Sequence, residues 1–232
     1  MARPAGERAT RWLLWVTLCT FVGSTGFFWK AGIPAVLPLF GRVIVVDPGH
    51  GGIDGGAHDH QGLLEKELNL EIAHRLRKHL REKGAFVVMT REGDHELSYL
   101  SNNYRSRHKR DLNSRVLIAE KSRADLMLSL HVNSSSGSYV RGSMVFYQPE
   151  NEESRRLAIL IQEELSKLSS WHDNPPLAGR VYYILRNSPV TTVLIEVGFL
   201  TNPEEKELLV TESYQEKLAE AISSAVVKFF QE

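Results

Sequence analysis

From residue 42 onward, short apolar runs alternate with longer amphipathic stretches, and this alternation limits the folds open to the chain. We interpret the apolar runs as strands over residues 43–46, 85–90, 124–130, 143–147, 182–185 and 192–196. Apolar side chains three or four positions apart predict helices over residues 65–83, 111–122, 157–168 and 203–232. Strands separated by helices of this length are typical of an α/β domain, so we predict a three-layer sandwich with helices on both faces of the sheet.

The residues before this domain follow another pattern. Residues 12–29 contain no charged side chain, and arginines precede them. A helix of this length would be about 27 Å long, close to the roughly 30 Å of a bilayer's hydrocarbon core. We therefore predict a basic cytoplasmic leader over residues 1–11, a transmembrane signal anchor over residues 12–29, a linker over residues 30–41 and an extracytoplasmic domain over residues 42–232. Small residues near the end of the apolar segment leave open a cleaved signal peptide, which would give a secreted domain.

Charge and cysteine content exclude several classes of protein. The 28 basic residues balance the 28 acidic ones, whereas a nucleic-acid-binding protein held by bulk charge would carry a basic excess. We therefore expect no nucleic-acid partner. One cysteine excludes an internal disulfide framework and a cysteine-based zinc site. A domain of about 190 residues buries enough surface to fold without such supports.

Residues that can bind a metal or transfer a proton occur near the ends of three predicted strands. The first strand leads into a turn with His50, the strand ending at residue 130 is followed by His131, and the strand over 192–196 ends with Glu196. Glu65 begins the first helix after a glycine-rich loop. Ligands of α/β sheets gather beyond the carboxyl ends of strands, and two histidines with one glutamate form a known hydrolytic zinc site. The spacing alone leaves both a metal site and purely structural histidines open.

Seven sequence blocks follow one another along the domain: VDPGHGGIDGG (46–56), LLEKELNLEIA (63–73), VVMTRE (87–92), DLNSRV (111–116), SLHVNS (129–134), YILRN (183–187) and LIEVGFLTNPEE (194–205). These blocks resemble one family of enzymes, the zinc-dependent N-acetylmuramoyl-L-alanine amidases with a zinc-carboxypeptidase-like α/β fold. The resemblance runs in continuous order over residues 42–230 and implies a mixed sheet. It also implies hydrolysis of the amide bond between the lactyl group of N-acetylmuramic acid and L-alanine in peptidoglycan.

The resemblance also implies roles for individual residues. His50, Glu65 and His131 match the family's ligands for one zinc ion, and Glu196 matches its catalytic glutamate. The same comparison implies two substrate-binding residues, Asn133 and Arg186. Val132 departs from the family pattern, because many relatives have a small residue there; this change would narrow the cleft and leave the ligands intact.

Three further residues near these blocks have structural interpretations. Asp47 precedes a Pro-Gly turn and is expected either to orient His50 or to form that turn. Arg91 and Arg115 are expected to be ion-paired beneath the site.

Within the family, the short chain with one N-terminal membrane segment and no wall-binding repeats looks most like the germination-specific amidases of the spore cortex. This similarity implies a forespore envelope enzyme on the route to muramic δ-lactam. It leaves open an accessory protein or a companion deacetylase as partners, and we expect a monomer. Two alternatives remain: a membrane-tethered, peptidoglycan-binding pseudo-enzyme, and a zinc peptidase that cuts the stem peptide.

Overall fold

The computed structural model describes residues 37–169, 171 and 173–231, which belong to one compact unit that begins at Leu37. The predicted leader (1–11), the predicted transmembrane anchor (12–29) and residues 30–36 of the predicted linker lie outside the described residues. Among the helices of the described part, none combines the length and the apolar character needed to span a bilayer.

Residues 37–41, the last part of the predicted linker, pack on the domain. Leu39 is fully buried, and its backbone N–H donates a hydrogen bond to the carbonyl of Lys83 at 2.9 Å. These residues form a turn that leads directly into the first strand.

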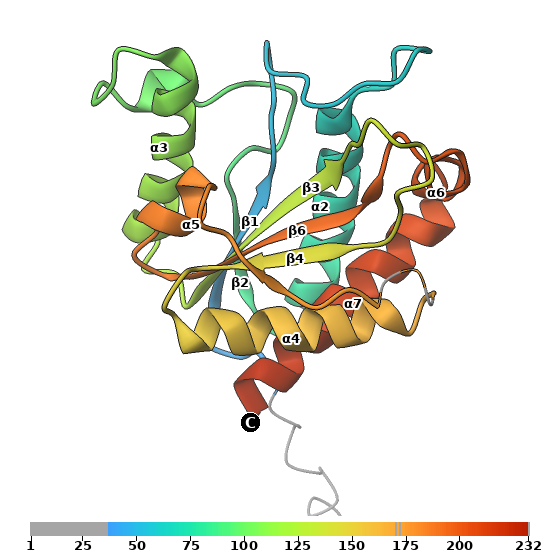
Figure 1. The fold of residues 1–232 in the computed structure, drawn as a ribbon. Helices are drawn as coiled ribbons and strands as arrows, with labels where there is room; N and C mark the ends of the chain where they lie inside the picture. Colours follow the sequence, from blue (N-terminus) through green and yellow to red (C-terminus); the bar gives the residue numbers. More distant parts are fainter. Residues whose placement is uncertain (1–36, 170, 172, 232) are drawn as a thin grey trace, which may run out of the picture. The chain divides into compact units, whose positions relative to one another are not determined.

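Six strands form one mixed sheet in the order β2-β1-β3-β6-β4-β5 (Figure 1). Strands β2, β1, β3 and β6 run parallel, whereas β4 is antiparallel to β6 and β5 is parallel to β4. The carboxyl ends of β1, β3 and β6 therefore lie at one edge of the sheet. The bounds are β1 Val43–Pro48, β2 Phe86–Met89, β3 Leu126–Asn133, β4 Met144–Tyr147, β5 Leu177–Ala178 and β6 Thr191–Phe199.

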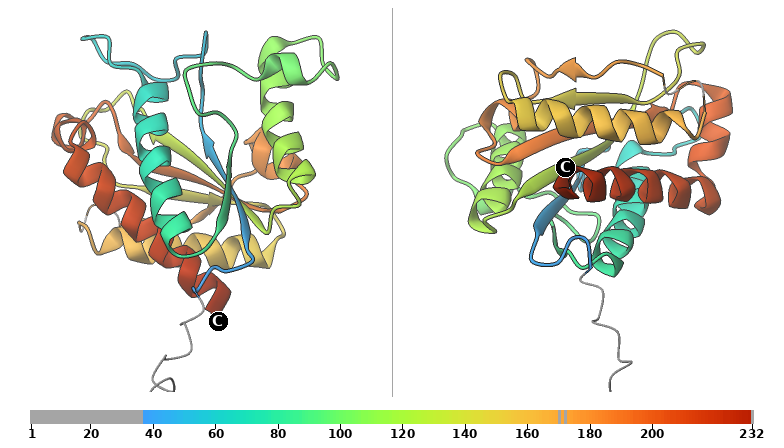
Figure 2. Two further views of the ribbon diagram at one scale, coloured as in Figure 1. Left: turned by 180° about the vertical axis from the view of Figure 1, so that it is seen from behind. Right: turned by 90° about the horizontal axis from the view of Figure 1, so that it is seen from below.

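Helices cover both faces of this sheet, as predicted for an α/β domain (Figures 1 and 2). Helices α2, α4 and α7 lie together on one face, and α3 and α5 lie together on the other. The bounds are α2 Glu65–Glu82, the short helix η1 Ser98–Leu100, α3 Arg107–Lys121, α4 Glu152–Ser166, α5 Tyr183–Asn187, α6 Pro203–Leu209 and α7 Glu212–Gln231.

Alternation along the strands separates two apolar cores. In β1, Ile44 and Val46 belong to the larger core under α2, α4 and α7, whereas Val45 belongs to the smaller core under α3 and α5. Successive side chains of a strand point to opposite faces. The same alternation therefore directs His131 of β3 and Glu196 of β6, which are register partners, toward the α3–α5 face.

The prediction of a strand over residues 182–185 is wrong, because residues 183–187 form helix α5. The Arg186 N–H donates to the Tyr182 carbonyl at 3.2 Å, and the Ser188 N–H donates to the Ile184 carbonyl at 2.9 Å. Ile184 and Leu185 are adjacent and both buried, an arrangement that a short helix packed in a corner allows. A short apolar run does not by itself distinguish a strand from a buried helix.

Other elements differ from the predictions mainly in their bounds. Strand β3 continues to Asn133, so His131 lies inside the strand rather than after it. Helix α3 begins at Arg107, four residues before its predicted start. Strand β5 and helix η1 were not predicted, because two or three residues carry no periodic pattern.

Candidate metal centre

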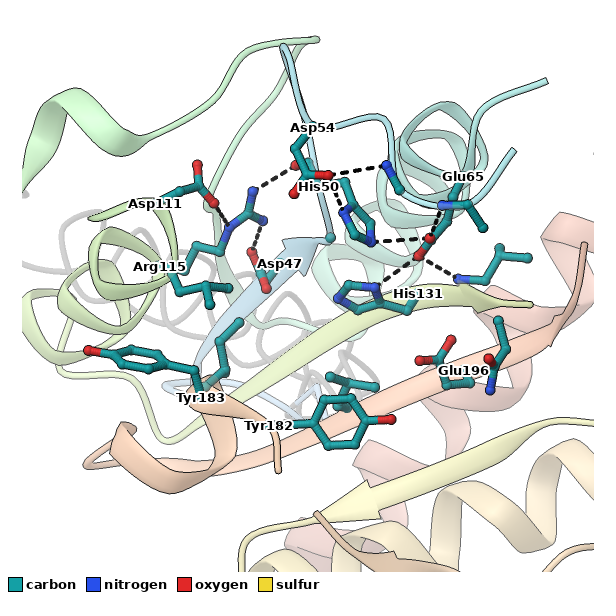
Figure 3. Close-up of a pocket in the computed structure, with 18 of the residues that line it drawn as sticks. Asp47, His50, Asp54, Glu65, Asp111, Arg115, His131, Tyr182, Tyr183 and Glu196 are labelled. Atoms are coloured by element: carbon teal, nitrogen blue, oxygen red, sulfur yellow. Dashed lines mark hydrogen bonds and ion pairs between the residues drawn. The ribbon is translucent and has the colours of Figure 1, made fainter. Parts of the chain in front are cut away.

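A cavity of about 440 Å³ opens at the edge of the sheet where β1, β3 and β6 end. Its wall is built from the loop after β1, the first turn of α2, the ends of β3 and β6, and parts of α3 and α5 (Figure 3). Of the predicted metal, catalytic and substrate-binding residues, five line it: His50, Glu65, His131, Asn133 and Glu196. Asp47 and Arg115, which sequence analysis placed near the site, line it as well.

His50, Glu65 and His131 converge on one point in this cavity. One ligand atom from each residue lies within 4.8 Å of those of the other two. His50 Nε2 is 3.1 Å from Glu65 Oε2, and His131 Nδ1 is 2.9 Å from Glu65 Oε1. The two imidazole rings meet edge to face, with their centroids 4.9 Å apart. The three residues predicted as metal ligands from distant parts of the sequence therefore form one cluster.

Two glycines make this close approach sterically feasible. A Cβ atom at Gly49 would lie 2.2 Å from Cε1 of His131. A Cβ atom at Gly56, where φ is +70°, would lie 2.5 Å from Glu65 Oε2 and 2.7 Å from His50 Cδ2. Any side chain at either position would occupy the space that the donors share. The backbone at these two glycines is thus in direct contact with the donor side chains.

Glu65 is held by hydrogen bonds from three directions. Its Oε2 accepts from the Ala57 N–H at 2.8 Å, and its Oε1 accepts from the Val132 N–H and from Asn69 Nδ2, both at 3.2 Å. Burial alone would raise the pKa of Glu65, but its hydrogen bonds with His131 and His50 hold that pKa well below the usual range. The carboxylate is therefore ionised and fixed toward the two imidazoles.

Asp54 is the second carboxylate beside His50. Its Oδ1 lies 3.0 Å from His50 Nδ1, so the other ring nitrogen, Nε2, faces Glu65. Burial would lower the pKa of His50, but Asp54 and Glu65 outweigh burial and raise it to about 9. The hydrogen bond with His50 in turn lowers the pKa of Asp54 to about 2. Orienting His50 was one of the two roles considered for Asp47. In the structure Asp54, four residues after the histidine, takes that role.

The donor set fits a zinc ion. Neutral imidazoles and a carboxylate are favourable zinc ligands, and three protein donors leave a position for water or substrate. In the protein without metal, the carboxylates around His50 hold a proton on its ring. A cation that binds between the donors would take the place of that proton, as metal binding to histidine generally does.

Glu196 lies beside this cluster and has the properties of a proton-transfer group. It is the register partner of His131 on the neighbouring strand, and only 7% of its surface is exposed. No group of the described residues donates a hydrogen bond to its buried Oε2. Burial raises the pKa of Glu196 to about 7, although the imidazoles of His131 and His50 oppose this shift. A carboxyl group with a pKa near neutrality can both accept and return a proton at neutral pH.

The two predicted substrate-binding residues occupy different places. Asn133 lines the cavity, where its Oδ1 accepts from the Ser134 N–H at 2.7 Å. Arg186 lies on α5 and lines a separate depression of about 360 Å³ together with Gln148 and Asn151. The structure therefore brings Asn133 to the three donors and does not bring Arg186 there.

Tyr182 also lines the cavity, although sequence analysis did not select it. Its ring packs against Phe146 with centroids 4.8 Å apart. Burial and the nearby charge of Glu196 raise the pKa of Tyr182 to about 12, so the hydroxyl stays protonated (Figure 3). A single tyrosine in an apolar run forms no motif. The one available signal was its position directly before the YILRN block.

Comparisons with known proteins agree on one family. A family model described as N-acetylmuramoyl-L-alanine amidase matches residues 44–228. The germination-specific N-acetylmuramoyl-L-alanine amidase of Bacillus subtilis (strain 168) is 40% identical over 207 residues, which cover 88% of this chain and 85% of that protein.

Two solved structures show the same fold. The CwlD amidase from Clostridioides difficile, solved in complex with the GerS lipoprotein, matches with a TM-score of 0.77 and 34% identity over 82% of this chain and 98% of its own. The N-acetylmuramoyl-L-alanine amidase AmiC2 of Nostoc punctiforme matches with a TM-score of 0.72 and 31% identity, with the same coverage of each chain.

Proposed function

The chain belongs to the N-acetylmuramoyl-L-alanine amidase family, and we propose that it is a zinc hydrolase of spore cortex peptidoglycan. Amidase activity on peptidoglycan follows from the family. The bond cleaved is the amide between the lactyl group of N-acetylmuramic acid and L-alanine. The convergence of His50, Glu65 and His131 beside the buried carboxylate of Glu196 is the observation that carries the zinc proposal.

In this proposal one zinc ion would be held by His50 Nε2, Glu65 and His131 Nδ1. When bound, zinc would act as a Lewis acid that polarises the scissile carbonyl, and it would lower the pKa of a water molecule to about 7. Glu196 accepts a proton from the attacking water at Oε2, the atom without a hydrogen-bond partner in the described residues. It returns that proton to the amide nitrogen as the carbon–nitrogen bond breaks. The products are a muramoyl carboxylate and a stem peptide with a free L-alanine amine.

Asn133 and Arg186 are proposed as substrate-binding residues, with unequal support. Asn133 faces the cavity in which the scissile amide would lie. Arg186 is supported only by its place in the YILRN block, and it lines the neighbouring depression rather than this cavity.

The cortex assignment and its cellular setting rest on the relatives. One relative is named germination-specific, and a structural neighbour is a complex with a lipoprotein. We therefore propose a forespore envelope enzyme that prepares muramic δ-lactam formation by a separate deacetylase, with a lipoprotein as accessory partner. A transmembrane anchor over residues 12–29, a catalytic domain over residues 42–232 with a zinc-carboxypeptidase-like fold, and a monomeric state complete the proposal.

The reaction can be tested by digesting purified cortex peptidoglycan and identifying the products by mass spectrometry. We expect glycan fragments whose muramic acid lacks a peptide, together with stem peptides that begin with free L-alanine. Release of D-alanine or of single amino acids without new muramoyl ends would instead indicate a zinc peptidase. Tight binding to peptidoglycan without any product would indicate a pseudo-enzyme.

Substitution Glu196→Gln tests the assigned base. We expect the variant to keep one zinc and to lose turnover by about 10²–10⁴-fold, the usual contribution of general acid–base catalysis. The matched control is Glu152→Gln on the exposed first turn of α4, which should retain the wild-type rate. A wild-type rate in the Glu196→Gln variant would remove Glu196 from the mechanism.

A further inference from the structure

Four buried charged side chains lie next to the candidate metal centre: Asp47, Arg91, Asp111 and Arg115. We call these four side chains the charge cluster. All but Arg91 also line the cavity. Arg115 Nε donates to Asp111 Oδ2 and Arg115 Nη1 donates to Asp47 Oδ1, both at 2.7 Å (Figure 3). Two positive and two negative charges give the cluster a formal charge of zero. Arg115 forms ion pairs with both aspartates, as predicted, whereas Arg91 bonds to backbone carbonyls and forms no ion pair within the described residues. Because buried ion pairs contribute little to stability compared with apolar packing, the presence of these side chains calls for another explanation.

The two arginines bind three consecutive backbone carbonyls that end at the metal-site histidine. Arg115 donates to the carbonyls of Pro48 at 2.8 Å and His50 at 2.7 Å. Arg91 donates to the carbonyls of Pro48 at 3.0 Å and Gly49 at 2.9 Å. These carbonyls lie where β1 ends. The guanidinium groups supply the hydrogen-bond donors that these carbonyls need.

This segment needs such support because His50 has a φ of +61°. A left-handed conformation is uncommon for residues other than glycine and persists where the surroundings impose it. The charge-assisted hydrogen bond from Arg115 holds the His50 carbonyl in this conformation, and it turns the imidazole into the cavity. Gly49, held by Arg91, is the residue against which the His131 ring lies.

The charge cluster also contacts the two other segments that carry donors. Arg91 Nη2 donates to the Lys66 carbonyl at 2.9 Å, in the first turn of α2 next to Glu65. Asp47 Oδ2 accepts from Ser129 Oγ at 2.7 Å, two residues before His131 in β3. Together the four side chains therefore contact the backbone of His50 and a near neighbour of Glu65 and of His131.

We propose that the charge cluster sets the geometry of the metal centre and thereby its affinity for zinc, with Arg115 as the main positioning residue. The inference rests on the proposed zinc site and adds a role for charged residues that are not among its three donors. It explains why arginines are present here: a planar guanidinium can bond to several acceptors at once, whereas a lysine ammonium cannot match this fork.

The test is the zinc dissociation constant of Arg115→Lys in the full chain, measured by competition with a chelator. Lysine keeps the positive charge beside Asp47 but cannot bond to Asp111, Pro48 and His50 together. We expect the dissociation constant to rise about 10–100-fold, as for other changes next to metal ligands. The matched control is Arg75→Lys, whose arginine pairs with Glu212 and Glu216 of α7, and it should leave zinc affinity unchanged.

A role in stability alone predicts a different result, namely a lower melting temperature with unchanged zinc affinity of the folded protein. That result for Arg115→Lys would overturn the inference. If Arg115→Lys does not fold, Asp111→Asn is measured instead, because it loosens Arg115 without removing it. A several-fold rise in its dissociation constant is expected, and an unchanged value would overturn the inference. A wild-type protein that binds no zinc would contradict the proposed function itself.

Discussion

At the scale of single residues, the environment of His50 determines whether the cavity holds a proton or a cation. Its Nδ1 faces Asp54 and its Nε2 faces Glu65, so the ring lies between two carboxylates. A carboxylate partner on the remote nitrogen fixes the tautomer of a metal-binding imidazole and increases its basicity. Asp54 therefore fixes the tautomer and increases the basicity of His50. Asn69 and two backbone N–H groups fix the position of Glu65.

Substitution Asp54→Asn should weaken zinc binding about tenfold, because the amide lacks the charge that makes His50 a stronger donor. The dissociation constant is measured by chelator competition, with Asp173→Asn at an exposed loop position as control. An affinity equal to that of the wild type would show that Asp54 does not act on His50.

Asp47 gives the metal-free protein an acid-sensitive element. Burial alone would raise its pKa, but the charge of Arg115 and hydrogen bonds from Thr90, Ser129 and Arg115 lower it below the usual 3.8. A lowered folded-state pKa stabilises the protein above the unfolded-state value, and this contribution is lost as the pH falls below it. The free energy of unfolding should therefore decrease from about pH 4 downward.

Urea unfolding of the metal-free protein at a series of pH values checks this expectation. Asp47→Asn should be less stable at pH 6, because Arg115 loses its charged partner, and its stability should depend less steeply on pH below about 4. Parallel pH profiles for the two proteins would exclude Asp47 as the source of acid sensitivity.

At the scale of elements, the loop between β1 and α2 combines glycines with donors so closely that its backbone is part of the site. Gly49 has an ordinary φ, so alanine is conformationally allowed there, but its Cβ would lie 2.2 Å from the His131 ring. We expect Gly49→Ala to displace His131 and to abolish stoichiometric zinc binding, while the far-ultraviolet circular dichroism spectrum stays that of the wild type.

The matched control is Gly93→Ala, where the nearest atom to the added Cβ lies at an ordinary 3.6 Å. This variant should bind one zinc as the wild type does. Full zinc occupancy in Gly49→Ala, measured by elemental analysis after gel filtration, would contradict the described packing of His131.

The elements that sequence analysis located correctly are those whose pattern repeats over many residues. Helix α2 was predicted over 65–83 and spans Glu65–Glu82, because Leu68, Ile72, Leu76 and Leu80 form one buried stripe. Helix α5 was missed because its five residues contain less than two helical turns. The convergence of the three donors could be anticipated, since the ends of neighbouring parallel strands meet at one edge.

Other parts of the site could not be anticipated because they depend on contacts between distant segments. Nothing near Arg115 in the sequence indicates that its guanidinium reaches the carbonyl of His50, 65 positions earlier. The choice of Asp54 rather than Asp47 as the partner of His50 follows from the path of the glycine-rich loop. That path is set by positive φ angles at His50, Gly51 and Gly52, which sequence spacing does not reveal.

At the scale of the whole domain, the site joins elements that are far apart in the chain. The described chain enters at Leu37 before β1, whereas the donors lie at the other end of the parallel strands. The three donors lie on the β1–α2 loop, on α2 and on β3, so a bound cation would connect the loop, the helix and the sheet. Zinc binding should therefore stabilise the whole domain rather than one loop.

A ligand that binds only the folded state stabilises it by RT ln(1 + [L]/Kd), about 2.7 kcal/mol when free zinc is 100 times the dissociation constant. Thermal unfolding with and without a chelator should show this increase for the wild type. Glu196→Gln should show the same increase, because Glu196 is assigned to proton transfer, whereas His131→Ala should show almost none. A zinc-dependent increase in His131→Ala equal to that of the wild type would remove His131 from the donor set, and loss of the increase in Glu196→Gln would make Glu196 a ligand instead of the base.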